Sequence, residues 1–222
     1  MTVEINFNRR KEDIEEAFQL LNFIVSIESH LNITLQSPNS NLIVTQEMQC
    51  VLKAQFIIVL YNLVESTVCD CLNSIYDAIL DDNLCFASLS SEMKELWKKY
   101  LQKRDLNGKD KKDNELANMP IEFKEWAIKI SGNLDCRKID EVFKKHGCCL
   151  DDSKRIKVCN SFLVIKNKRN QLAHGSISFS ACGSNYLLSE LKKFKEDIFS
   201  YIEDLVNVTQ NYVKMKKYKV IE

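Results

Sequence analysis

The chain has 222 residues, of which 45% are apolar, and its 31 acidic and 31 basic residues give a formal net charge of zero. This length and apolar content suit one domain, or one domain with an insertion, and zero charge by itself gives no indication of nucleic-acid binding. Only five glycines and two prolines are present. These are too few for the many turns of an all-β domain, so long helices are expected.

The N-terminal part contains two predicted helices with a break between them. Apolar residues at helical spacing predict a first helix over residues 9–31, and the polar residues 37–41 then interrupt the chain. A second, long helix is predicted over residues 45–80, with Thr45 as its N-cap. Because residues 54–69 are apolar on nearly every side, this helix is expected to form the centre of the core.

We interpret residues 86–150 as an insertion between core helices. Within them, residues 98–113 are charged and poorly periodic, which indicates either a solvated loop or an arm that contacts RNA. Residues 120–147 are expected to form two short helices around Gly132 and Asn133.

The C-terminal part predicts two further core helices. One spans residues 153–173, with Gly175 as its stop, and the last spans residues 187–213 and carries a clear apolar stripe. A weak segment of serine and glycine, residues 175–185, is expected to connect them. The sequence therefore predicts an all-α helical bundle formed by a single domain over residues 1–222.

The nine cysteines are an odd number and lack metal-ligand spacing. Cys69 and Cys71 are separated by one residue, and Cys148 and Cys149 are adjacent. Neither pair is a C-x-x-C, and no histidine pair completes a zinc site. We therefore expect reduced, mostly buried thiols, no metal site and no cofactor.

The N-terminal residues are polar and show no signal peptide. The longest apolar stretch, residues 56–64, is far shorter than the roughly 20 residues that span a bilayer. We expect a soluble, cytoplasmic protein that does not insert into a membrane.

Arg169 continues an apolar stripe. Val158, Phe162 and Ile165 are spaced by four and three residues, and the next positions on that face are Arg169 and Leu172. An arginine at such a position usually pairs with an acidic residue or belongs to a functional site. The alternative is that its methylene groups pack on the core while its guanidinium reaches solvent.

His174 lies five residues after Arg169, near the predicted end of the same helix. Only His30 and His146 occur elsewhere in the chain, so a histidine-based mechanism depends largely on His174. The carbonyl groups at a helix C-terminus favour a protonated imidazole, and a permanent cation beside a proton-transfer group suits phosphodiester chemistry. The alternative is a histidine that only caps the helix.

Charge is unevenly distributed around these two residues. No acidic residue occurs from residue 153 to residue 189. Such a window favours binding to a phosphate backbone, whereas a solvated helix face usually mixes both signs. The candidate RNA-binding residues in this window are Lys154, Arg155, Lys157, Lys166 and Lys168.

Glu65 is the only charged residue between Lys53 and Asp70, within the most apolar predicted helix. A buried carboxylate needs a cation, and Arg169 or Lys168 could provide it. Glu65 is then either part of a catalytic site or a structural partner that orients the arginine.

Three segments resemble a known family. The sequence KNKRNQLAHG at residues 166–175 resembles the signature of the HEPN superfamily, whose ribonuclease members carry Arg-x4-6-His. LYNLVES at residues 60–66 extends the resemblance, and SGNLD at residues 131–135 is similar to a prokaryotic HEPN group found near toxin and phage-defence genes.

The resemblance implies a HEPN-like bundle that dimerises, with the Arg-x4-His segments of two copies facing each other in a composite site. It also implies metal-independent RNA cleavage by the ribose 2′-hydroxyl, which leaves a 2′,3′-cyclic phosphate and a 5′-hydroxyl. In that reaction His174 transfers protons, Arg169 stabilises the charge on phosphorus, and Asn170 positions the motif or the substrate.

The expected role is that of a toxin or anti-phage defence effector, with RNA as substrate and an antitoxin or regulatory protein as partner. One position departs from the family pattern. Some HEPN toxins carry a tyrosine two residues after the histidine, which a partner nucleotidyltransferase modifies, and this chain has Ser176 there. Silencing by adenylylation at that position is not expected.

Two other functions stay open. The chain could be a non-catalytic HEPN module that binds nucleotides or RNA, or that scaffolds a partner. A helical bundle used only for protein interaction is the third reading, but it leaves the acid-free basic window unexplained.

Overall fold

A computed structural model describes residues 2–26, 33–103, 112–123, 127–128, 130, 132–150 and 152–220, without the side chains of residues 26, 33 and 152–155. Among these residues the chain forms eight α-helices, one 3-10 helix and one pair of short strands. The elements are α1 (Val3–Ser26), β1 (Ile33–Ser37), β2 (Ser40–Val44), α2 (Gln46–Asp81), η1 (Phe86–Ser88), α3 (Ser91–Lys103), α4 (Asp113–Leu116), α5 (Cys136–Lys145), α6 (Asp152–Ala173), α7 (Phe179–Gly183) and α8 (Leu188–Lys214).

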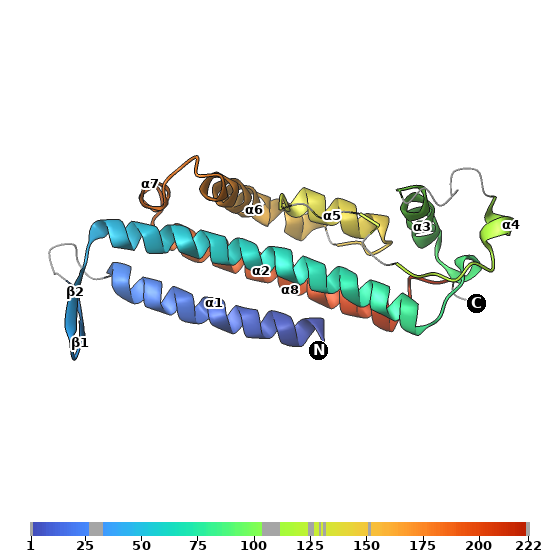
Figure 1. Ribbon diagram of the computed structural model, residues 1–222, viewed down its shortest axis with the longest axis horizontal. Helices are drawn as coiled ribbons and strands as arrows, with labels where there is room; N and C mark the ends of the chain where they lie inside the picture. Colours follow the sequence, from blue (N-terminus) through green and yellow to red (C-terminus); the bar gives the residue numbers. More distant parts are fainter. Residues whose placement is uncertain are drawn as a thin grey trace.

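Three long helices, α1, α2 and α8, run along the long axis of the molecule (Figure 1). α5 and α6 form a layer on the side of α2 and α8 that lies opposite α1. α2 is the central helix, since it packs against α1, α6, α7 and α8. The predicted all-α bundle and its central helix are confirmed.

Helix α2 begins where the sequence predicts. The hydroxyl of Thr45 accepts a hydrogen bond from the amide of Met48 at 3.2 Å, which caps the helix. By length and composition α2 could also cross a membrane, but half of its most apolar stretch is buried inside the bundle. Its buried residues face the other helices of the bundle, so α2 is a core helix.

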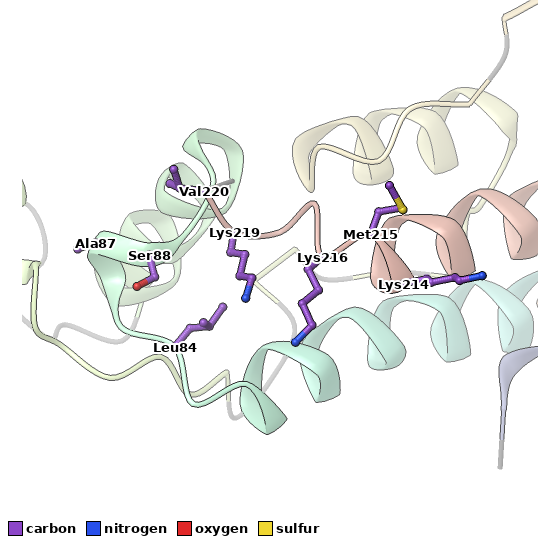
Figure 2. A pocket seen from close by; sticks show the side chains of 8 residues that line it. All are labelled: Leu84, Ala87, Ser88, Lys214, Met215, Lys216, Lys219 and Val220. Atoms are coloured by element: carbon purple, nitrogen blue, oxygen red, sulfur yellow. The ribbon is translucent and has the colours of Figure 1, made fainter. Parts of the chain in front are cut away.

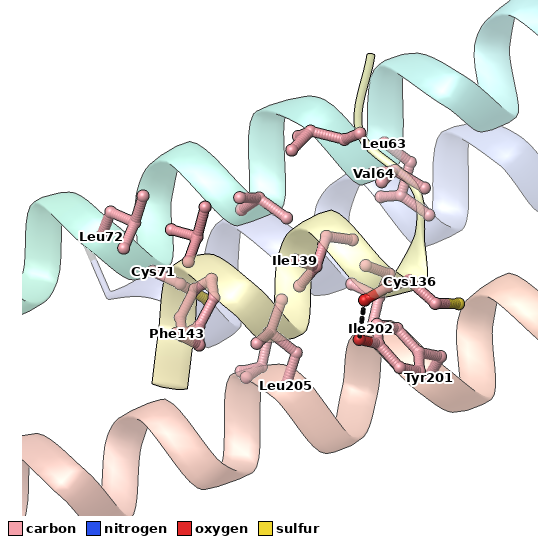
Figure 3. Packing of buried hydrophobic residues seen from close by; sticks show 14 of the residues in the cluster. Leu63, Val64, Cys71, Leu72, Cys136, Ile139, Phe143, Tyr201, Ile202 and Leu205 are labelled. Atoms are coloured by element: carbon pink, nitrogen blue, oxygen red, sulfur yellow. Dashed lines mark hydrogen bonds between the residues drawn. The ribbon is translucent and has the colours of Figure 1, made fainter. Parts of the chain in front are cut away.

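Figure 3 shows the part of the core where α2, α5 and α8 meet. The buried side chains drawn there include Leu63, Val64, Cys71 and Leu72 of α2, Ile139 and Phe143 of α5, and Ile202 and Leu205 of α8. The hydroxyl of Tyr201 on α8 donates to Asp140 Oδ1 at 2.8 Å and lies 3.5 Å from the carbonyl oxygen of Cys136. This packing holds the start of α5, and with it the segment just before α5, against the bundle.

The predicted break after the first helix is an antiparallel hairpin. β1 and β2 pair from Ile33 opposite Val44 to Ser37 opposite Ser40, and the hydroxyl of Ser37 donates to the carbonyl of Ser40 at 3.3 Å. The hairpin projects from one end of the bundle (Figure 1). Of the predicted first helix, residues 27–31, including His30, lie outside the described residues.

The region 86–150 differs from the sequence expectation in two ways. Residues 98–103 complete the amphipathic helix α3, so the expected loop or arm is wrong for them, and residues 104–111 lie outside the described residues. Of the two short helices expected around Gly132 and Asn133, the second is confirmed as α5, whereas the first is wrong for the described residues 120–123, 127–128 and 130, which form no helix. Helix α5 begins at Cys136 because Asp135 is its N-cap, with Oδ1 accepting a hydrogen bond from the amide of Lys138 at 3.0 Å.

The end of α6 agrees with the sequence. Gly175 has φ of +67°, its amide donates to the carbonyl of Leu172 at 3.1 Å, and the amide of Ser176 donates to the carbonyl of Gln171 at 2.9 Å. These two bonds form a Schellman motif, which ends a helix at a glycine.

Helix α7 was not predicted from residues 175–185. Ser178 caps it, accepting from the amide of Ala181 at 3.2 Å. Gly183 lies so close to α2 that a Cβ there would be 1.8 Å from the carbonyl oxygen of Cys50. The glycine that looks like a loop residue in the sequence is what lets α7 pack on α2.

Candidate functional site

Helix α6 places Arg169 between two buried residues of its own stripe, Ile165 and Leu172. The Arg169 side chain is 26% exposed. It therefore lies at the edge of the core rather than in solvent, which is where the apolar spacing predicts it. The opposing surface is formed by α2 and by residues 132–135.

The guanidinium of Arg169 is held from three sides. Nη2 lies 3.4 Å from Glu65 Oε2, and Nη1 donates to the carbonyl of Gly132 at 3.3 Å and to Asn170 Oδ1 at 3.2 Å. The guanidinium carbon lies 4.7 Å from the centroid of the Tyr61 ring. The structure thus brings together Arg169, Asn170 and Glu65, which were singled out in the sequence.

Tyr61 forms a platform under the guanidinium, and sequence analysis did not assign it a role. Its hydroxyl accepts a hydrogen bond from the amide of Leu134 at 3.0 Å, and burial raises the pKa of Tyr61. The ring therefore offers an uncharged π face to the cation. The signal was present in the sequence, because Tyr61 and Glu65 are four residues apart on one helix face.

The segment before α5 contacts the Arg-x4-His motif through Gly132 and Asn133, while Leu134 binds Tyr61 and Asp135 binds Lys166, which precedes the motif on α6. A Cβ on Gly132 would lie 2.7 Å from Arg169 Nη1, so glycine is what allows this close approach. Asn133 Oδ1 accepts from Asn170 Nδ2 at 2.5 Å. Asp135 Oδ2 accepts from Lys166 Nζ at 2.7 Å.

The Asp135–Lys166 ion pair is largely shielded, with side chains 18% and 16% exposed. Burial alone would raise the pKa of Asp135, but the hydrogen bonds from Lys166 and from the amide of Lys138 hold it below its usual range. Lys166 and Arg169 therefore both have acidic partners, which come from outside α6. The positive field around the motif is smaller than the acid-free window of the sequence suggests.

Of the remaining basic residues of the window, one is exposed, one is half-buried and two have side chains outside the described residues. Lys157 is exposed, and Lys168 Nζ donates to Gln171 Oε1 at 3.2 Å. The side chains of Lys154 and Arg155 are outside the described residues.

His174 is the first residue after α6 and is exposed. Its amide donates to the carbonyl of Asn170 at 3.0 Å, whereas its ring has no hydrogen-bond partner among the described residues. Five residues of helix separate it from Arg169, which is about 7.5 Å along the axis and roughly 140° around it. Arg169 faces α2, so the two side chains do not converge within one chain.

A cavity of about 820 Å³ at the opposite end of the bundle is lined by Lys214, Lys216 and Lys219 together with Leu84 and Ser88 (Figure 2). Two of these lysines share one acidic partner, since Lys216 and Lys219 lie 2.6 Å and 3.6 Å from the carboxylate of Asp82, which compensates one of their two charges.

Within the described ranges, no three candidate metal ligands lie together. All nine cysteines are free, and five of them are buried. Cys149 is the exposed one. This burial agrees with the prediction of mostly buried thiols, and their reduced state stays a prediction.

A family model described as MAE_28990-like HEPN matches residues 2–218. No curated protein and no solved structure matches the chain. The family match covers nearly the whole chain, including both the Arg-x4-His motif and the segment at residues 132–135. The chain therefore belongs to the MAE_28990-like HEPN family.

Proposed function

We propose that this chain is a metal-independent endoribonuclease, with single-stranded RNA as its substrate. The observation that carries the proposal is the constrained guanidinium of Arg169, which Glu65, Gly132 and Tyr61 hold beside the exposed end of α6. A cation fixed in advance stabilises developing charge at little reorganisation cost, which is the usual basis of electrostatic catalysis. Membership of the HEPN family also supports this function.

The reaction is transesterification within the RNA. His174 accepts the proton of a ribose 2′-hydroxyl, the 2′-oxygen attacks the adjacent phosphorus, and the bond from phosphorus to the 5′-oxygen breaks. The leaving 5′-oxygen takes up a proton from the second His174 of a dimer, so the products are a 2′,3′-cyclic phosphate and a 5′-hydroxyl. Arg169 stabilises the negative charge on the pentacoordinate phosphorus.

A homodimer is part of the proposal. Within one chain Arg169 faces α2 while the ring of His174 lies exposed and without a partner among the described residues. A second copy that presents its own α6 end would complete a site from two Arg169–His174 pairs. Light scattering should show two chains per particle, and a fully active monomer at micromolar concentration would contradict the composite site.

RNA is expected to approach along the outer face of α6, past Lys168 and Lys157 and past Arg155 and Lys154, which lie within one turn before Lys157. Lys166 contributes less directly, because its charge is paired with Asp135. We further propose a cytoplasmic toxin or anti-phage defence role, with an antitoxin or regulatory protein as partner. Growth arrest on expression, absent in the His174→Ala variant, is the cellular expectation.

A non-catalytic HEPN module that binds RNA or nucleotides, or scaffolds a partner, is the second candidate. The observation that favours it is that three N–H groups of Arg169 are already used by acceptors in the protein. In that case the arginine mainly holds α2, α6 and residues 132–135 together. Such a protein would bind RNA without cutting it.

Cleavage of an end-labelled single-stranded RNA by the purified chain in EDTA separates the two candidates. His174→Ala and Arg169→Ala should each reduce the rate on the order of 100-fold or more. The double variant should lose little more, because both residues act on one transition state. Activity that chelation abolishes and magnesium restores would refute the metal-independent mechanism.

A further inference from the structure

A directed chain of hydrogen bonds leads from Arg169 through Asn170 to Asn133. Arg169 Nη1 donates to Asn170 Oδ1 at 3.2 Å, and Asn170 Nδ2 donates to Asn133 Oδ1 at 2.5 Å. A guanidinium has donors and no acceptor. The oxygen of Asn170 must therefore face Arg169, its NH2 group must face Asn133, and the oxygen of Asn133 must accept.

This order fixes what the chain presents to solvent. Asn133 is exposed, and its own NH2 group has no acceptor among the residues that the structure describes. Two of the five N–H groups of Arg169, on Nε and Nη2, are likewise left without an acceptor there. A cation and an exposed amide donor are thus joined through one residue, Asn170.

We propose that Asn133 binds the RNA directly, by donating a hydrogen bond to a non-bridging oxygen of the phosphodiester that Arg169 contacts. The inference rests on the proposed function, and adds to it a substrate-binding residue from outside the Arg-x4-His motif. A phosphate is the group that suits this surface, because it offers several oxygen acceptors and a negative charge to adjacent donors.

The loop geometry explains why this residue is available. Gly132 brings the backbone against the guanidinium, and Asp135 anchors the segment through the N-terminus of α5 and through Lys166. Asn133 lies between these two fixed points. Its carboxamide is therefore held in place on both sides, by the backbone and by Asn170.

The competing role for Asn133 is to support Asn170 without contacting RNA. A double-mutant cycle separates the two roles, because a residue that acts only through Asn170 has no effect once Asn170 is removed. The variants are Asn133→Ala, Asn170→Ala and the double variant. Asn207→Ala, an exposed asparagine on α8, is the matched control and should bind RNA as the parent chain does.

The measurement is the dissociation constant for a single-stranded oligonucleotide with 2′-O-methyl riboses, which cannot be cleaved by a 2′-hydroxyl. Asn133→Ala should weaken binding on the order of 10-fold, as expected for loss of a hydrogen bond to a charged group. It should weaken binding to a similar extent in the Asn170→Ala background. Thermal unfolding of each variant checks that the fold is retained.

Base composition provides the second arm. All-uridine and all-adenosine oligonucleotides should lose the same factor, since a phosphate contact carries no sequence information. A loss restricted to one base would overturn the phosphate assignment. Unchanged affinity in Asn133→Ala, or no further loss in the Asn170→Ala background, would overturn direct contact.

These outcomes are distinguishable from failure of the nuclease proposal. If the parent chain binds the oligonucleotide and cuts no unmodified RNA, the nuclease function fails while the contact of Asn133 with phosphate stands. If the parent chain cuts RNA and Asn133→Ala binds and cuts equally well, the contact fails and the nuclease function stands.

Discussion

The guanidinium of Arg169 occupies the space that a side chain at Gly132 would need, since a Cβ there would lie 2.7 Å from Nη1. The two residues are 37 positions apart in the chain: Arg169 lies on α6, and Gly132 lies in the segment before α5. The Arg-x4-His motif and the segment before α5 are therefore one structural unit. Changes in that segment should act on the motif.

Gly132→Ala is expected to lower activity with little effect on stability. The clash is with the end of a flexible side chain, and the backbone at Gly132 is outside the left-handed region, so the fold can accommodate alanine. Arg169 must move, and a displacement of about 1 Å at a catalytic group can cost up to roughly 100-fold in rate. The cleavage rate and the Tm should be measured together. Full activity would show that the position of the guanidinium does not matter.

Glu65→Gln should lower the cleavage rate on the order of 10-fold, between the His174→Ala variant and the parent chain. The glutamine keeps the shape of the side chain but removes the charge that orients Arg169. Both side chains of this pair are partly exposed, so the free energy of unfolding should change little. The effect should appear in kcat more than in KM. A large loss of Tm would instead assign Glu65 a structural role.

Lys157→Ala and Lys166→Ala should behave differently although both remove one lysine of the same window. Lys157 is exposed, so its loss should weaken RNA binding and reduce the salt slope by about one. Lys166 is paired with Asp135, so its loss should lower the Tm by leaving that carboxylate without its partner. Binding as a function of salt, together with thermal unfolding, tests both. Equal salt slopes in the two variants would contradict this division.

The free energy of unfolding should decrease as the pH is lowered through the range where His146 titrates in the unfolded chain. Nδ1 of His146 lies 2.7 Å from the carbonyl of Val142, so it carries the proton, and Nε2 accepts from the hydroxyl of Tyr76 at 2.8 Å. Burial lowers the pKa of His146 to about 4. The unfolded chain therefore binds the proton first, and stability that is present above pH 6.5 is lost between pH 6.5 and 4.

The loss from His146 should reach about 3 kcal/mol by pH 4. Urea unfolding at several pH values measures it, and His146→Gln is the control, because a neutral amide removes this titration. Carboxylates such as Asp135, whose pKa is lowered, add their own loss only at lower pH. If the parent chain and His146→Gln have the same pH dependence above pH 5, His146 is not the group responsible.

Features that depend on local sequence could be predicted well. Thr45 marks the start of α2 and Gly175 marks the end of α6, because a cap depends on a few neighbouring residues. The pairing of Glu65 with Arg169 could also be anticipated, because an isolated charge in an apolar helix needs a partner and few cations were candidates.

Features that depend on contacts distant in the chain were missed. The close approach of Gly183 to Cys50 makes α7 a packed helix, yet a serine- and glycine-containing segment has the composition of a loop. The acidic partners of α6 come from residues 65 and 135, so counting charges within one window overestimates the local field. The contact between Asn170 and Asn133 cannot be read from spacing, since 37 residues separate the two.

The chemistry of the RNA ends tests the central claim most directly. The purified chain is incubated with a single-stranded RNA in EDTA, and with the same RNA carrying one 2′-deoxyribose on the 5′ side of the scissile phosphate. The proposed mechanism predicts 2′,3′-cyclic phosphate and 5′-hydroxyl ends, no cleavage at the deoxy position, and loss of cleavage in His174→Ala. Products with 3′-hydroxyl ends, cleavage after the deoxyribose, or a His174→Ala variant that cuts as fast as the parent chain would contradict it.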